Sequence, residues 1–470
     1  MTRSSWVLTL TSASAFMVAL DQLVVATALA TMQRDLHASL ATLEWTVNAY
    51  SLGFAVLLMT GSALGDRFGR RRVLMSGVAL FTVSSALCAL APTVGALIAA
   101  RTVQGAASAL VLPNAMAIVT AAFPPAQRGR ALGIFTALMG TAVVAGPILG
   151  GAITQGLDWP WIFWLNVPIG LLVLPMLRLR TDETRGPARR IDVVGVLLAA
   201  GAALGLVWAL IRGNGAGWGS AEVLATLAGG ALLLVAFVAW ERRVSDPMLP
   251  LHLFRSRGFA IGNASAFFLY ATLASSVFFL AQFLQLALGF DPLAAGLRMA
   301  PWTATVLICA PLSGRFVDRF GPRIPLVFGL LAQAAGFTWI AAISDSSRGY
   351  PTYAIALALA GCGITAAMPA AQAAVLGAVE PAAIGKASGT LNTMRQVGAA
   401  FGVAILAAVF ATHGSYASAA SFRLGVTPAI AVAAGMSVVG ALIGVALPRR
   451  RSSSGVVPST PTRERAHASA

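Results

Sequence analysis

The residues GSALGDRFGRRR (61–72) form a short, arginine-rich connection between two long apolar runs. Part of this connection returns later in the chain, because Asp66-Arg67-Phe68-Gly69 recurs as Asp318-Arg319-Phe320-Gly321, 252 residues further on. Each copy follows an apolar run that is long enough to cross a bilayer, for which about 20 residues are needed. Internal repeats of this kind are common in transporters, so the repeat predicts a chain built from two related halves.

A second set of residues repeats at the nearly equal offset of 256, which supports the two-half interpretation. In this set Arg130 matches Lys386, and the glycine, proline and alanine matches are Pro113, Pro125, Ala126, Gly129, Ala131, Gly133 and Gly146 with Pro369, Pro381, Ala382, Gly385, Ala387, Gly389 and Gly402. The shift corresponds to eight apolar runs. Two groups of six helices therefore flank two extra helices.

The composition predicts an all-α polytopic membrane protein. Of the 470 residues, 58% are apolar and 10% are charged, whereas a soluble protein carries about 25% charged residues. We expect fourteen transmembrane helices in a 6+2+6 arrangement, over residues 6–30, 43–64, 73–91, 94–122, 130–154, 161–177, 192–211, 221–240, 259–286, 293–314, 324–343, 351–377, 386–411 and 426–447.

The basic residues predict the orientation of these helices. With fourteen spans, 25 of the 32 Lys and Arg residues fall on one side and four on the other, and only Arg101, Arg298 and Arg395 fall inside spans. Basic loops face the cytoplasm, so both termini are expected there, in the cell membrane. The excess of Arg, with a single Lys, hints at a bacterial source.

The repeat and the composition also divide the chain. We expect an N-terminal six-helix bundle at residues 1–180, two linker helices at 181–257 and a C-terminal six-helix bundle at 258–448. Residues 449–470 are rich in Ser, Pro, Thr and Arg and are expected to form a disordered cytoplasmic tail.

Several classes of function conflict with this pattern. The net charge of +16 comes from arginines in short loops, which argues against a nucleic-acid partner. The three cysteines lie in separate apolar runs and the four histidines lie in loops or the tail, so we expect no disulfide framework, no metal site, no cofactor and no enzymatic centre.

Asp21 is the one acidic residue deep inside a span, and an ionisable group there marks an ion or substrate pathway by default. At about 1.5 Å per residue, Asp21 lies about 8 Å and Arg101 about 10 Å below the outer face, so the two charges can pair. Gln104 is on the same helix face as Arg101. Burial disfavours the charged carboxyl and the cation favours it, so Asp21 is a candidate proton-coupling group together with Arg101 and Gln104. A static ion pair that locks two helices together is the alternative.

Three further groups are candidates for roles in transport. A cytoplasmic gate is predicted at the two repeated loops, a hinge where small residues and a proline meet in the fifth span, and a substrate cavity at polar and aromatic residues near the second and thirteenth spans. The gate residues are Gly61, Asp66, Arg67, Gly69, Arg70, Arg71, Asp318, Arg319 and Gly321; the hinge residues are Gly146, Pro147 and Gly150; the cavity residues are Trp45, Asn48, Tyr50, Asn392, Arg395 and Gln396.

These motifs together resemble the major facilitator superfamily, and more narrowly its fourteen-helix drug:proton antiporter branch. The resemblance covers residues 14–410 and includes the loop at 61–72, Arg101-Thr-Val-Gln104-Gly105, Gly146-Pro147-Ile-Leu-Gly150-Gly151, Trp159 to Gly170, Pro247 to Phe254, and Gly385 to Gln396. The chain departs from the branch after Asp21, where it has Leu23, Ala26 and Ala30 instead of Thr or Ser, Asn and Pro, and at Trp159-Pro160-Trp161, where the branch has Trp-Arg-Trp.

The resemblance implies alternating access between two six-helix bundles, with Asp21 and Arg101 at the positions linked to proton coupling. We therefore expect a monomeric, proton-coupled antiporter that exports amphipathic drugs or toxic organic compounds across the lipid bilayer. An exporter of one defined metabolite or self-made antibiotic, and a non-transporting sensor paralogue, are the alternatives.

Overall fold

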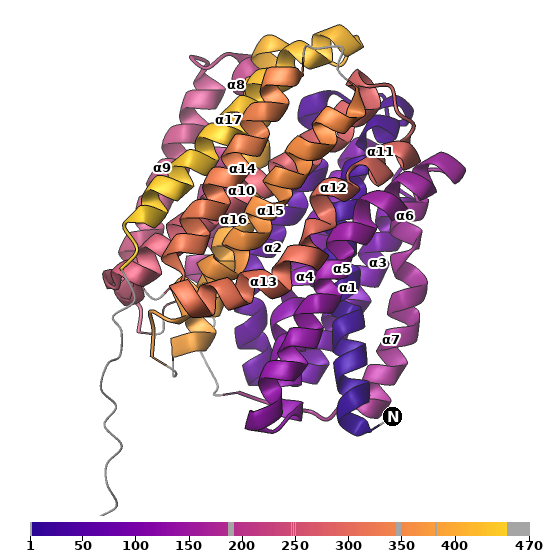
Figure 1. Ribbon diagram of the computed structural model, residues 1–470. Coiled ribbons are helices and arrows are strands. Elements are labelled where there is room, and N and C mark those ends of the chain that lie inside the picture. The colour runs from indigo at the N-terminus through magenta and orange to yellow at the C-terminus, as the bar shows by residue number, and fades with distance from the viewer. Residues whose placement is uncertain are drawn as a thin grey trace, which may run out of the picture.

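The computed structural model describes residues 2–186, 192–245, 247, 249, 251–344, 349–380 and 383–448, and the predicted tail at 449–470 lies outside them. Helices account for nearly all of the described chain (Figure 1). They are α1 (Arg3–Asp35), α2 (Leu40–Phe68), α3 (Arg70–Ala89), α4 (Val94–Ala122), α5 (Pro125–Gly156), α6 (Trp161–Trp164), α7 (Asn166–Arg180), α8 (Val193–Ala216), α9 (Ala221–Glu241), η1 (Leu251–Arg255), α10 (Arg257–Gln282), η2 (Phe283–Ala287), α11 (Pro292–Arg298), α12 (Ala300–Thr303), α13 (Thr305–Phe320), α14 (Arg323–Ile343), α15 (Tyr350–Leu376), α16 (Ile384–His413) and α17 (Ala419–Val445).

Thirteen helical segments of the described chain are long and apolar enough to cross a membrane. The fourteenth crossing, predicted as one helix at 293–314, is instead broken into α11, α12 and α13. Pro301 lies at the start of α12, and proline has no N–H to continue a helical hydrogen-bond ladder. The prediction of a single helix was therefore wrong at this position, although the three pieces follow one another from α11 to α13 along the bundle (Figure 1).

The two copies of the repeated loop have the same local structure. Gly69 ends α2 with φ +110° and Gly321 ends α13 with φ +76°, and positive φ is a conformation that glycine adopts without strain. The guanidinium carbon of Arg67 lies 5.2 Å from the ring centre of Phe68, and that of Arg319 lies 5.3 Å from that of Phe320. This match supports the two related halves inferred from the sequence.

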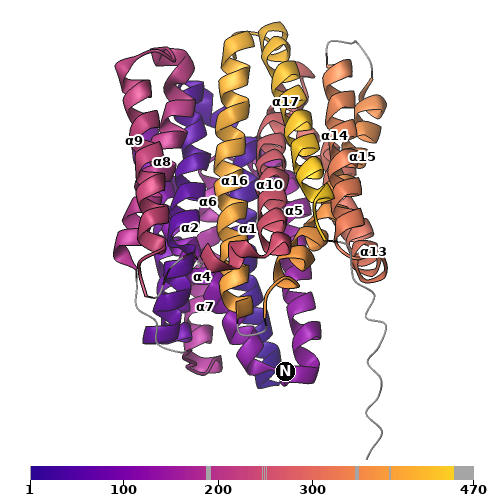
Figure 2. The ribbon, with the colours of Figure 1, turned by 90° about the vertical axis from the view of Figure 1, so that its left-hand side faces the viewer.

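Helices α1 to α7 pack mainly against one another, and so do α10 to α17. Helices α8 and α9 form a separate pair at one edge of the molecule (Figure 2), and α8 contacts both α2 and α16. This packing supports the proposed division into two bundles and a linker pair. Large apolar side chains cover the outside of all three parts: Leu172 of α7, Leu232 of α9 and Phe328 of α14 are 67%, 69% and 67% exposed, as expected of a surface that faces lipid.

The two halves contact each other closely at the end of the bundle opposite Arg3, which we call the far end. Here α5 finishes and α11 begins (Figure 1). A Cβ atom on Gly151 would collide with the carbonyl oxygen of Pro292, and one on Gly296 with that of Pro147. The Leu293 amide also donates to Gln155 Oε1 over 3.2 Å. The far end, which the arginine distribution predicts to be the outer face, is therefore closed in this structure.

Candidate functional site

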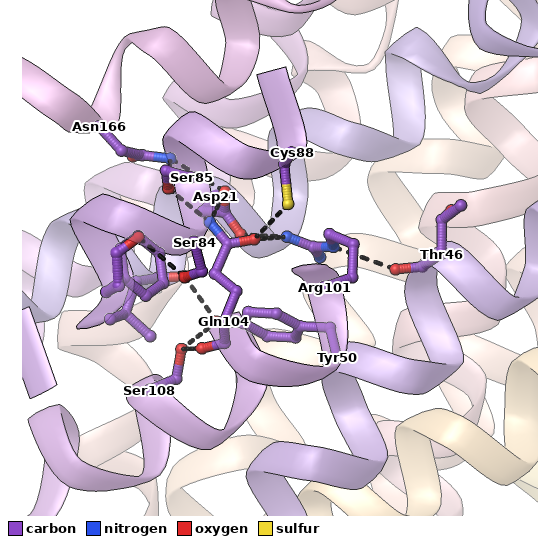
Figure 3. Close-up of polar contacts among 12 residues, drawn as sticks. Asp21, Thr46, Tyr50, Ser84, Ser85, Cys88, Arg101, Gln104, Ser108 and Asn166 are labelled. Carbon is purple, nitrogen blue, oxygen red and sulfur yellow. Dashed lines mark hydrogen bonds and ion pairs between the residues drawn. The ribbon is translucent and has the colours of Figure 1, made fainter. Parts of the chain in front are cut away.

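A buried ion pair between α1 and α4 forms the centre of the candidate site (Figure 3). Arg101 Nη1 donates to Asp21 Oδ2 over 2.5 Å, and the two side chains are 1% and 0% exposed. The ion pair expected from the depth of the two residues is thus present. Its part in proton coupling stays a prediction.

Gln104 bridges the two charged groups. Its side-chain amide donates to Asp21 Oδ1 over 3.0 Å, and its carbonyl oxygen accepts from Arg101 Nη1 over 2.7 Å. The same amide nitrogen also lies 2.6 Å from Ser85 Oγ on α3. Gln104 therefore holds both partners of the pair at once, as its position one turn beyond Arg101 suggested.

Two further contacts to the pair were not anticipated from the sequence. Asn166, at the start of α7, donates to Asp21 Oδ1 over 3.0 Å and to Ser85 Oγ over 3.3 Å. Arg101 Nε donates to the backbone oxygen of Thr46 on α2 over 3.0 Å. Asn166 falls within a stretch that matched the family, but nothing in its local sequence assigns it to Asp21, since it lies 145 residues away.

Tyr50, which we had predicted to line the substrate cavity, lies beside this cluster. Its ring centre is 4.2 Å from the Arg101 guanidinium carbon, and its hydroxyl is 2.8 Å from Ser108 Oγ. The aromatic face stabilises the cation. A Cβ atom on Gly105 of α4 would collide with the Tyr50 backbone, so this glycine allows the close approach of α2 and α4 that brings the tyrosine under the arginine.

The cluster thus surrounds a buried acid and a buried base with hydrogen-bonding groups of the protein. Charge-assisted hydrogen bonds are shorter and stronger than neutral ones, and Asp21 accepts from three donors while Arg101 is bonded to three acceptors. Five elements contribute to it, namely α1, α2, α3, α4 and α7. A change in the charge of Asp21 would therefore affect contacts among all five of these elements of the N-terminal half.

The segment of α1 that follows Asp21 connects this cluster with the rest of the molecule. Gln22 donates to Gln396 Oε1 of α16 over 3.1 Å, and the Thr27 backbone oxygen accepts from Gln285 of η2 over 3.0 Å. Leu23 packs against Gly146 of α5. Within two turns of the carboxyl, α1 thus makes two hydrogen bonds to the C-terminal half.

The predicted hinge glycines bring helices together. Gly146 faces Leu23, Gly150 faces Val24 and Thr27 of α1, and α5 continues through Pro147 without interruption. They allow α5 to pack closely on α1. Any hinge motion at Pro147 stays a prediction.

The other cavity candidates occupy two different places. The ring of Trp45 packs against that of Trp208 of α8, with the ring centres 5.4 Å apart. On α16, Arg395 donates to Asn392 Oδ1 over 3.1 Å and lies over the Tyr270 ring at 4.3 Å. With Gln396 these two α16 side chains are half-buried where the halves face each other, so they remain candidates for substrate contact.

At the predicted gate, the first loop is bonded within itself and to the chain after α7. Arg70 pairs with Asp66 at 2.7 Å. Glu183 accepts from the backbone N–H of Arg71 over 2.9 Å and from that of Arg72 over 3.3 Å, and so stabilises the positive end of α3.

Besides Asp21 and Glu241 at the end of α9, Glu44 is a further buried acid of the described chain. It lies near the start of α2, as its sequence position indicates, yet it is only 3% exposed. Cys309 and Cys362, which come from separate apolar runs, lie 3.6 Å apart, sulfur to sulfur, as free thiols. Within the described ranges, three or more potential metal ligands gather nowhere.

Two related groups of six crossings and a linker pair, with an ion pair buried in one of the groups, are typical of a secondary membrane transporter. The family model for the Major Facilitator Superfamily matches residues 11–281 and 263–469. The chain therefore belongs to the major facilitator superfamily, in its fourteen-helix branch of drug and antibiotic exporters.

Curated relatives with known names support this placement. The chain is 35% identical to the Tetracenomycin C resistance and export protein of Streptomyces glaucescens, covering 84% of this chain and 74% of that one. It is 36% identical to the Multidrug resistance protein Stp of Mycobacterium tuberculosis, with the same coverage, and 34% identical to the Puromycin resistance protein pur8 of Streptomyces alboniger, covering 98% and 96%. In fold it resembles a peptide transporter crystallised with sulfate, with a TM-score of 0.69 at 16% identity and 94% coverage of each chain.

Proposed function

We propose that the protein is a proton-coupled antiporter that exports amphipathic drugs or toxic organic compounds by alternating access between its two halves. The observation that carries the proposal is the buried Asp21–Arg101 pair with its amide ligands. A buried ion pair is costly relative to apolar packing, and an intramembrane acid by default marks an ion pathway.

In this proposal, protonation of Asp21 is the step that is coupled to movement of the helices. A neutral carboxyl gives up its ionic bond to Arg101, which keeps its contacts to Thr46, Gln104 and the Tyr50 ring. The link between α1 and α4 then weakens. Because α1 carries Gln22 and Thr27, which bond to the C-terminal half, this loosening reaches the contact between the halves.

Substrate is proposed to bind between the halves, where Asn392, Arg395 and Gln396 are half-buried. The relatives named for multidrug, tetracenomycin C and puromycin resistance support an organic compound as cargo. Each proton that enters with a membrane potential of 100 mV supplies about 2.3 kcal/mol, which can drive export.

The test is uptake of a fluorescent organic cation into inverted vesicles, driven by an imposed pH gradient and normalised to folded protein. We expect Asp21→Asn to lower gradient-driven uptake at least about tenfold, since Asn cannot titrate, while downhill exchange survives. Asp291→Asn is the matched control, because Asp291 is exposed and caps α11, a role that Asn fills equally well. Wild-type coupling in Asp21→Asn would contradict the proposal.

Export of one self-made antibiotic is the second candidate function. It is favoured by the relatives whose names contain a single compound, tetracenomycin C or puromycin. A panel of chemically diverse compounds in the same vesicles separates the two functions, because a multidrug exporter moves several unrelated cations and a dedicated exporter moves one.

A further inference from the structure

Glu44 is a second buried acid that the proposed mechanism does not use. It lies near the far-end start of α2 and is 3% exposed. In the part of the chain that the structure describes, no ion pair includes it and no hydrogen bond reaches its carboxyl. Asp21, by contrast, has a cation and two amide donors. The two acids are similarly buried, but only the carboxyl of Asp21 has a cation and hydrogen-bond donors to stabilise its negative charge.

The side chains around Glu44 offer little to an ionised carboxylate. Tyr416, between α16 and α17, is its electrostatic neighbour, and burial together with Glu44 raises the pKa of Tyr416 well above its ordinary range. The Tyr416 hydroxyl already donates to Gln282 Oε1 of α10. One turn along the same face of α2, Asn48 is fully buried, and neither polar atom of its amide has a partner.

Charged groups on the elements packed against α2 are engaged elsewhere. Arg101 of α4 is bonded to Asp21, Arg212 of α8 pairs with Glu222 at 3.1 Å, and Arg395 of α16 is bonded to Asn392. Other titratable groups near this end include Arg34, Asp35 and His37, where α1 leads into α2, and His413, whose Nδ1 lies 2.6 Å from Thr412 Oγ1. Arg423 of α17 donates to the backbone oxygen of Ala287, and Arg298 of α11 donates to that of Ala294.

Burial of an unpaired carboxylate costs several kcal/mol, and such a group neutralises instead. Glu44 sits where α2 meets Tyr416 and Gln282 of the C-terminal half, at the closed far end. Separation of the halves at this end would bring water to the carboxyl and allow it to ionise. Closure of the far end is therefore favourable only with a proton on Glu44.

We propose that Glu44 is a proton-binding site whose occupancy is linked to closure of the far end: one proton binds from the far-side solution as this end closes and leaves when it opens. The proposal rests on the alternating access of the proposed function but not on proton coupling at Asp21. Low pH on the far side then holds this end closed, and high pH releases it.

The test measures the opening directly, by the distance between spin labels on Gly156→Cys of α5 and Ala411→Cys of α16. Both positions are exposed at the far end, and a Cβ atom on Gly156 meets nothing within 4 Å. Cys88, Cys309 and Cys362 are replaced by Ser. All samples carry Asp21→Asn, so that Asp21 does not titrate and the result is independent of whether Asp21 couples protons.

With Glu44 present, we expect the ratio of open to closed molecules to rise with pH by up to about tenfold per unit over the titration, as one linked proton requires. With Glu44→Gln, which stays neutral, the far end should remain closed at every pH. Glu222→Gln, the same change at an exposed acid of the linker pair, should keep the pH response of the protein that retains Glu44. A pH response that survives Glu44→Gln, or none with Glu44, overturns the proposal.

A second measurement does not depend on the variant folding. A hydrophobic carbodiimide modifies protonated carboxyls in apolar surroundings, and peptide mass spectrometry locates the adduct. We expect labelling of Glu44 in the wild-type protein that falls as the pH is raised. Absence of any Glu44 adduct at low pH, while other buried acids are labelled, would contradict a protonated Glu44 in the closed state.

Discussion

The contrast between Asp21 and Glu44 shows that burial alone does not determine the state of an acid. Asp21 lies against Arg101, Gln104 and Asn166 and is held as part of an ion pair. Glu44 is nearly as buried without such partners. The partners of Asp21 favour its charged form, and no comparable group favours a charged Glu44, so the two can respond to different steps of one transport cycle.

Substitution of Arg101 separates a coupling role from a static ion pair. If Asp21 is the proton site, Arg101→Ala removes the cation that favours its charged carboxylate. The pH dependence of transport by the folded variant should then move to higher pH. Loss of one partner of a buried pair also costs about 3–5 kcal/mol of stability, so uptake must be normalised to folded protein.

The double variant Asp21→Asn, Arg101→Leu completes this comparison. A static pair predicts that removing both charges restores the folded yield together with transport. The coupling role predicts that folded protein returns but gradient-driven uptake does not. Fluorescence-detected size exclusion reports the yield, and vesicle uptake reports the coupling.

At the scale of the elements, neighbouring glycines of α5 serve different contacts. Gly150 faces α1 in the same half, whereas Gly151 faces Pro292 of α11 in the other half. Adjacent residues of one helix thus take part in packing that persists and in packing that must break if the halves separate. Helix α5 therefore contributes both to the stability of the N-terminal half and to closure of the far end.

We predict different outcomes for Gly150→Val and Gly151→Val. Gly150→Val overpacks the α1–α5 contact, so it should lower the free energy of unfolding by about 1–3 kcal/mol. The second should leave the folded yield nearly unchanged but favour an open far end and slow transport. Gly133→Val, at a helical glycine whose Cβ would meet nothing within 4 Å, controls for valine in a helix. Equal effects of the first two variants would argue against this division.

Much of the element order could be predicted from the sequence, and the misses have physical causes. Apolar runs and basic loops gave the crossings, because bilayer thickness and charge placement act locally. The break before α12, next to Pro301, was missed because hydropathy counts apolar residues and ignores a missing N–H. Asn166 and Glu44 were missed because their contacts or burial depend on helices far away in the chain.

For the whole molecule, the far-end contacts predict that the two halves must separate there during each cycle. Gln155→Cys and Leu293→Cys, placed on either side of the hydrogen bond between α5 and α11, can be joined by a short, cleavable thiol cross-linker. We expect nearly complete loss of transport on cross-linking and recovery when the linker is cleaved.

The chain supplies a matched control for this experiment. Cys309 of α13 and Cys362 of α15 are 3.6 Å apart within the C-terminal half. A cross-link between them should leave most transport intact, because a half that moves as one body does not change its internal distances. Transport that survives the cross-link between α5 and α11 would show that the far end need not open.

The linker pair α8 and α9 has a consequence for how such a chain can change its length. The pair leaves from and returns to the same side of the bundle, so α10 starts on the side on which α1 starts. A hairpin of two crossings can therefore be acquired or lost without inverting the half that follows it. A single additional crossing would turn that half upside down and place its arginine-rich loops on the wrong side of the membrane, so growth of this fold by insertion is restricted to even numbers of helices.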